Sequence, residues 1–167
     1  DSQLSVAAND CDFLVARKTL ADEKRYTING WIDTADTLGV NLRKMLTSMS
    51  GNISYMGGVF AVYAGNYALT SLVASDDDFV TSLKLNNKNL RDSFNGAKGI
   101  YRTPDLNWQE EDYPPYQLAS GLTIDGEANW IDIAQPLFPS AATAQRIAKI
   151  AVTRSRAVRI SEGDVHR

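Results

Sequence analysis

The sequence lacks the residues on which many catalytic and metal sites are built. It has one cysteine, Cys11, and one histidine, His166, among 167 residues. A single cysteine excludes an internal disulfide and a cysteine-based zinc site, and a free thiol fits assembly in a reducing compartment. A Ser-His-Asp or Cys-His arrangement would depend on a histidine at the end of the chain. We therefore expect no metal, no cofactor and no histidine-based catalysis.

Long apolar runs and nucleotide-binding glycine motifs are also absent. No apolar stretch approaches the roughly 18 to 20 residues of a membrane-spanning helix, and no signal peptide is visible. The sequence contains neither Gly-x-x-x-x-Gly-Lys-Ser/Thr nor a Gly-x-Gly-x-x-Gly motif after a strand. Because no apolar run is long enough, we expect no membrane contact for this part of the protein. The chain begins with Asp1 rather than methionine, so we expect it to be a piece of a longer polypeptide.

The composition is typical of one folded domain, with 44% hydrophobic and 22% charged residues. The net charge of -3 is unevenly distributed. The segment 140–167 has six basic residues (Arg146, Lys149, Arg154, Arg156, Arg159, Arg167) against Glu162 and Asp164. A basic helix can contact nucleic acid, but cations at a helix C-terminus more often lie on a solvated face. Because the remainder is acidic, we do not expect sequence-specific nucleic-acid binding.

Two amphipathic helices are predicted. The first has one apolar stripe at offsets of four, seven, eight and eleven (Leu38, Leu42, Met45, Leu46, Met49). Asp33 and Thr34 supply helix-start chemistry before it, and Gly51 ends it as a C-terminal cap. Ser140 caps the second helix, whose small face predicts close packing on a sheet (Ala144, Ile147, Ala148, Ala151, with Val152 beside it).

Strand signals lie between these helices and around them. Gly57-Gly58 predicts a two-residue hairpin turn between Ile53, Tyr55 and Phe60, Val62. Further strands are expected at 26–32 with a bulge at Gly30, at 93–103 with close backbone approach at Gly96 and Gly99, at 130–137 before Pro139, and at 158–160. Asp76, Asp77 and Asp78 do not have the alternating spacing of a calcium loop, so a capped helical turn is favoured there.

These elements predict an α+β fold, with an antiparallel sheet or barrel-like domain flanked by two amphipathic helices. We expect a lead-in arm at 1–23, the domain itself at 24–160, and a short tail at 161–167.

The stretch Asn95–Pro115 concentrates prolines, aromatic residues and three consecutive acids. Glycoside hydrolysis needs two suitably separated carboxylates, but nothing near Glu110 and Glu111 would raise the pKa of only one of them. Sugar binding without catalysis is the alternative, on a stacking platform of Trp108, Tyr113, Tyr116 and Trp130. Such aromatic residues more commonly cover a core or a subunit contact.

Four segments together resemble one family, a domain of tail proteins in tailed bacteriophages and prophages. Residues 24–33 are similar to its "RYT-x-NG-x-ID" opening. Residues 38–65 are similar to "LL-x-SM-x-G…GG-x-(F/Y)-x-(V/I)-YAG". Residues 95–115 resemble "N-x-V-x-G-x-Y-x-x-PD-x-NW-x-x-x-D-(F/Y)-PP", with Ala97 where valine is usual, and residues 140–149 resemble "SAATAQRLAK". Trp31 is larger than the common residue at its place.

This resemblance, which extends to lambda-like tail tip and host-specificity proteins, implies a structural subunit without catalytic residues or cofactors. It implies a tail tip or baseplate hub domain that assembles in the bacterial cytoplasm into the virion tail, as a homotrimer beside other tail tip and tail tube proteins. The candidate interface is the proline- and aromatic-rich segment (Arg102, Pro104, Trp108, Tyr113, Pro114, Pro115, Tyr116). The alternative is a carbohydrate-binding module for host-surface recognition.

Overall fold

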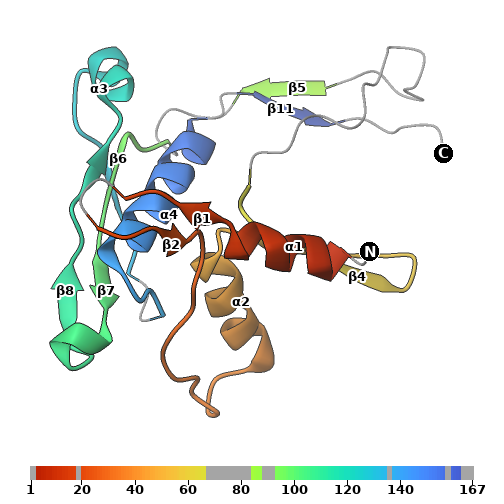
Figure 1. Cartoon of the computed structure of the whole chain (residues 1–167). Coiled ribbons are helices and arrows are strands. Elements are labelled where there is room, and N and C mark those ends of the chain that lie inside the picture. The colour runs from red at the N-terminus through yellow and green to blue at the C-terminus, as the bar shows by residue number, and fades with distance from the viewer. Residues whose placement is uncertain are drawn as a thin grey trace.

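The computed structural model describes residues 3–17, 20–66, 84–87, 93–134, 137–156 and 159–162, with backbone alone for Met56, 84–87 and 159–162. Its helices are α1 (Gln3–Asp12), α2 (Leu38–Ser48), the 3-10 turn η3 (Pro104–Leu106), α3 (Ala119–Asp125) and α4 (Ala141–Ser155). Its strands are β1 (Leu14–Val15), β2 (Glu23–Lys24), β3 (Asn52–Met56), β4 (Val59–Tyr63), β5 (Lys84–Asn87), β6 (Gly96–Lys98), β7 (Ile100–Arg102), β8 (Glu110–Asp112), β9 (Tyr116–Gln117), β10 (Trp130–Asp132) and β11 (Arg159–Glu162). The fold is α+β, as predicted (Figure 1).

Helix α4 is the centre of the packed core, beside β6, β7 and β9 (Figure 1). Its start is as predicted: Ser140 has an extended backbone, and its Oγ accepts a hydrogen bond from the backbone N–H of Thr143 at 3.1 Å. The predicted apolar face is confirmed for Ala144, Ile147, Ala148 and Val152, which are buried, whereas Ala151 is only half-buried. They pack with buried aromatic residues from the rest of the core, Tyr26, Tyr101, Tyr113 and Phe138.

The strands form several small sheets, and the described residues contain no closed barrel. Strand β6 lies between β10, to which it is parallel, and β9, to which it is antiparallel. Strand β7 instead pairs with β8 in a separate hairpin. The predicted strand at 93–103 is therefore divided at Gly99, where φ is 155° and an added Cβ would lie 2.1 Å from the carbonyl oxygen of Ile133. Close backbone approach at this glycine ends one sheet and starts the next.

The hairpin of β3 and β4 matches its prediction. The two strands pair antiparallel from Asn52↔Tyr63 to Met56↔Val59. Gly57 and Gly58 form the turn with φ of 60° and 83°, the left-handed values that a type I′ turn requires. In Figure 1 this hairpin extends away from α4, with α1 running beside it.

The predicted strand at 26–32 is wrong. Strand pairing stops at Lys24, and the following segment is irregular. Tyr26 enters the core with 5% of its surface exposed, its N–H donates to Cys11 O, and its hydroxyl donates to Gly65 O at 2.5 Å. At the start of this segment, hydrogen bonds of Tyr26 to Cys11 and Gly65 therefore take the place of strand pairing. Strand β10 also ends at Asp132, earlier than the predicted Leu137.

Helix α2 starts later than its sequence signals indicate. Asp33 Oδ1 instead accepts the N–H of Ala35 at 2.8 Å in a local turn, and Thr37 occupies the N-cap position. At the other end, the residue with left-handed φ is Ser50, at 48°. Gly51 is needed for space, because an added Cβ would lie 2.5 Å from Tyr63 O.

Two helices were not predicted. Helix α1 lies in the segment expected to be a lead-in arm, where Ala7 is buried and the helix contacts β4. Helix α3 follows β9 and ends at Gly126, whose φ is 74°. The predicted C-terminal strand is found as β11, paired antiparallel with β5. The prediction of a capped helical turn at Asp76 to Asp78 lies outside the described residues.

Candidate functional site

The segment 103–116 has defined secondary structure, with η3 and β8 inside it and the start of β9 at its end. Strand β7 pairs with β8 from Ile100↔Asp112 to Arg102↔Glu110, and η3 forms the connection. The three consecutive acids are therefore strand residues, and all three are exposed. Their partners explain the strand: Arg102 forms an ion pair with Glu110, and the Tyr101 hydroxyl donates to Glu111 Oε2 at 2.7 Å.

Glu110 and Glu111 do not form a pair of facing carboxylates. Successive residues of a strand point to opposite faces, and the two carboxylates contact different partners, Arg102 and Tyr101. The hydrogen bond to Glu111, with burial second, raises the pKa of Tyr101 to about 12. This geometry gives no support to the two-carboxylate mechanism considered from the sequence.

An aromatic–arginine cluster (Trp31, Arg102, Trp108) lies at the end of this hairpin. The two indole rings are 6.3 Å apart in an edge-to-face arrangement, and the Arg102 guanidinium carbon lies 5.3 Å from the centre of the Trp31 ring. Trp108 has a left-handed backbone, with φ of 62°, and its backbone N–H donates to the carbonyl oxygen of Thr103 at 3.1 Å. Sequence reasoning selected Arg102 and Trp108 but missed Trp31, which 62% exposure leaves available for contact.

The other predicted interface residues differ in how deeply they are buried. Pro104, Pro114 and Pro115 are exposed, and Tyr116 is half-buried on β9. Tyr113 is only 1% exposed and belongs to the core, where its hydroxyl lies 3.4 Å from Ile133 O. Burial, and then the nearby Asp132 charge, raise the pKa of Tyr113 to about 12. Tyr113 therefore cannot supply contact area to a neighbour in this conformation.

A cavity of about 560 Å³ lies between the β7–β8 hairpin and β10. Trp130, Asp132 and Lys98 line it from the three-stranded sheet, and Asp112 and Pro115 line it from the hairpin segment. Trp108 and Tyr116 do not line this cavity, so the four aromatic residues predicted as a sugar platform are not one surface. Of these four aromatic residues, only Tyr113 and Trp130 line the cavity.

Most of the basic side chains predicted along the second helix have internal partners. Arg146 pairs with Glu23 at 2.9 Å, and Arg154 donates to Ser50 O at 3.1 Å. Arg156 pairs with Asp125 at 2.6 Å, and this bond, together with one from Asn95, lowers the pKa of Asp125. These arginines connect α4 to other elements, which leaves less free positive charge on this helix for an external partner.

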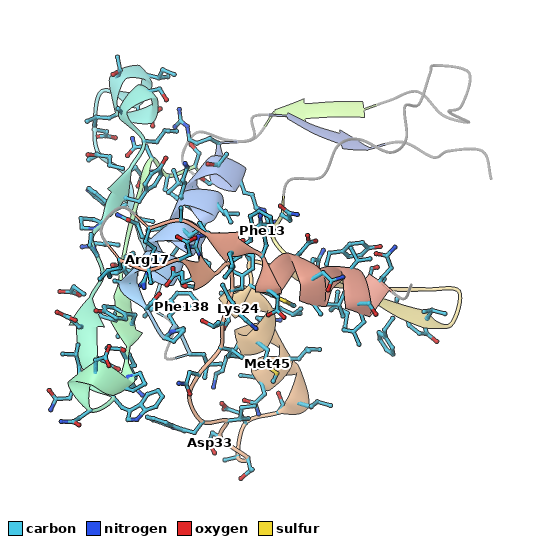
Figure 2. All side chains as sticks on the ribbon, viewed as in Figure 1. Phe13, Arg17, Lys24, Asp33, Met45 and Phe138 are labelled. Atoms are coloured by element: carbon cyan, nitrogen blue, oxygen red, sulfur yellow. The ribbon has the colours of Figure 1, made fainter. Side chains whose placement is uncertain are left out.

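Most of the exposed large hydrophobic side chains in the described residues come from the first part of the chain. Among the described residues, every exposed large hydrophobic residue except Leu106, Ile124 and Trp130 lies between positions 4 and 63. The stripe of α2 belongs to this group, with Leu38 85% exposed, and so do Tyr55 and Phe60 at 63% and 68% on the hairpin, whose rings are 4.7 Å apart. Figure 2 shows Met45 of this stripe on α2, apart from the buried core residue Phe138.

Within the described part of the chain, no three or more His, Cys, Asp and Glu side chains are grouped to hold a metal ion. No helix there is both long and apolar enough to cross a bilayer. In comparisons with known proteins, no family model matches the chain, and no curated protein matches it either.

Proposed function

We propose that the chain is a non-catalytic structural domain of a bacteriophage or prophage tail tip or baseplate hub. It acts in tail assembly, between the tail tube and the host-recognition parts, as a homotrimer in contact with other tail tip and tail tube proteins. The four motifs that resemble the tail protein family suggest this role. The α+β architecture is consistent with it.

The observation that carries the proposal is the exposed apolar surface of residues 4–63. Large apolar side chains that are exposed in such number are typical of surfaces that contact other proteins. Here the outer side of α2 and the tip of the β3–β4 hairpin both contribute exposed side chains, led by Leu38 and Phe60. An assembly subunit would bury these residues against its neighbours.

The aromatic–arginine cluster supplies a second contact area of different chemistry. Tryptophan and arginine are enriched where proteins meet, and Trp31 and Trp108 are held in place by each other and by Arg102. The exposed prolines on either side restrict the backbone, which lowers the entropy lost on association. We therefore retain Arg102, Pro104, Trp108, Pro114, Pro115 and Tyr116 as interface residues and add Trp31.

Site-specific photo-cross-linking in assembled tail particles tests this proposal. A photoreactive side chain at Leu38, Phe60 or Trp108 should form cross-links to a neighbouring tail protein or to a second copy of the chain. Ile124 on α3 is the matched control, because it is 74% exposed and no other large hydrophobic residue of its helix is exposed. Equal cross-linking at Ile124 and at the three test positions, or none at any of them, would contradict the proposal.

A further inference from the structure

The cavity beside β10 has the size and lining of a small-molecule site. Its volume of about 560 Å³ falls within the roughly 300–1,000 Å³ typical of ligand pockets. It lies between the edge of the three-stranded sheet and the β7–β8 hairpin, apart from α2 and the β3–β4 hairpin. Of the residues retained above for the interface, only Pro115 lines the cavity.

Trp130 is a rigid platform in this cavity. Parallel pairing places it directly opposite Gly96, and an added Cβ at Gly96 would lie 2.5 Å from the indole Cε3 atom. The ring therefore covers the glycine backbone, which only a residue without a side chain permits. Trp130 as a whole remains 39% exposed and lines the cavity, so part of its side chain is open to a ligand that stacks on it.

Charged side chains surround the indole on the same face of the sheet. Asp132 is two residues along β10 from Trp130 and is directly opposite Lys98, whose Nζ lies 4.0 Å from Asp132 Oδ1. The side chains of Asp132 and Lys98 are 75% and 56% exposed, so their hydrogen-bonding atoms are accessible. Asp112 adds a second carboxylate from the hairpin.

We propose that this cavity binds one neutral saccharide unit of a glycan. The apolar C–H face of a pyranose ring stacks on Trp130, its hydroxyl groups donate to Asp112 and Asp132, and Lys98 donates to a ring or hydroxyl oxygen. Two carboxylates against one ammonium leave an excess negative charge, which disfavours anionic sugars. This goes beyond the proposed assembly role, since no residue of the 4–63 surface lines the cavity.

The test is direct titration of the purified 167-residue chain with methyl glycosides of glucose, galactose, mannose, N-acetylglucosamine and N-acetylgalactosamine. Saturation-transfer difference NMR and calorimetry report binding without any tail assembly. We expect at least one of these glycosides to bind with a Kd below about 10 mM. Methyl glucuronide should bind more weakly than methyl glucoside. No binding by any neutral glycoside, or tighter binding of the glucuronide, overturns the proposal.

Matched variants locate the site. Trp130→Ala should weaken binding about tenfold through lost stacking, and Asp132→Asn should weaken it about fivefold through a lost charge-assisted hydrogen bond. Trp108→Ala changes the same residue type outside the cavity and should leave the Kd unchanged. Circular dichroism checks that each variant is folded. If Trp130→Ala does not fold, the Kd of Asp132→Asn alone tests whether the cavity is the binding site. Binding unchanged in both cavity variants, or reduced equally in Trp108→Ala, overturns the proposal.

Because these titrations use the isolated chain, their failure leaves the assembly proposal intact. Conversely, failed cross-linking in tail particles does not affect saccharide binding.

Discussion

Replacement of Asn95 by alanine should cause a large loss of stability. Asn95 is fully buried, at 0% exposure, immediately before the glycine on which Trp130 lies. Its Nδ2 atom donates to Asp125 Oδ2 and to Glu127 O, each at 2.8 Å, and its Oδ1 atom accepts the N–H of Asn129 at 2.9 Å. One side chain therefore holds the α3–β10 connection to the start of β6.

The magnitude follows from these three bonds. A bond to a charged group contributes about 1.5–3 kcal/mol and a neutral one about 0.5–1.5 kcal/mol, and a partner left unsatisfied in a buried place adds to the cost. Asp125 keeps its bond to Arg156, which limits the loss there. We expect Asn95→Ala to lower the free energy of unfolding by about 3–5 kcal/mol, a large part of the roughly 5–15 kcal/mol that typical domains have.

Urea unfolding followed by circular dichroism measures this difference. Asn66→Ala is the control, because Asn66 is exposed and its side chain makes one surface hydrogen bond, to Asp10 at 2.8 Å. Its effect should be within about 0.5 kcal/mol. A loss below about 1 kcal/mol for Asn95→Ala, or equal losses for the two variants, would refute the view that Asn95 organises this part of the fold.

Three further predictions concern local structure. Gly99→Ala should lower the free energy of unfolding by at least about 2 kcal/mol, because the new Cβ would meet the Ile133 carbonyl oxygen at 2.1 Å. Gly39→Ala in α2 has open space around it and should instead stabilise the chain by about 0.5–1 kcal/mol. Similar results for both variants in urea unfolding would contradict this. Ser140→Ala should cost about 1 kcal/mol by removal of the N-cap bond, and an unchanged melting temperature would show that the cap is unimportant. The pKa of Asp125 is lowered from an ordinary value near 3.8, so its contribution to stability is present above that value and is lost as the pH falls through its folded-state pKa. Acid unfolding of Asp125→Asn should therefore depend less steeply on pH below about 4 than that of the unmodified chain, and identical pH profiles would disprove the linkage.

Elements with strong local signals could be predicted from the sequence. Gly57-Gly58 fixes the β3–β4 turn through its backbone conformation, and Ser140 followed by a small apolar face fixes α4. Both depend on residues close together in the chain. Local chemistry alone therefore identified them.

Elements that depend on distant contacts could not be predicted in the same way. The alternation at 26–32 suggested a strand. Instead, Tyr26 is hydrogen-bonded to Gly65, which is far away in sequence, and to Cys11, which lies in α1. The acids of β8 are poor strand formers on their own, and their strand is stabilised by partners on β7.

The candidate site was predictable only in part. The composition of 95–115 pointed to Arg102 and Trp108, but nothing local indicates that Trp31 joins them or that Tyr113 is buried. The Trp130 cavity depends on the register between β10 and β6, which places Gly96 under the indole. Parallel pairing across more than thirty residues leaves no short-range signal in the sequence.

The most direct test of the central claim is the position of the chain in tail particles. Immunogold electron microscopy, with antibodies against the purified chain, should be applied to particles produced by the genome that encodes it. We expect gold at the distal end of the tail in intact particles and no label on heads. Unlabelled particles with the protein found only in the particle-free fraction, or label on heads instead of tail tips, would contradict the account.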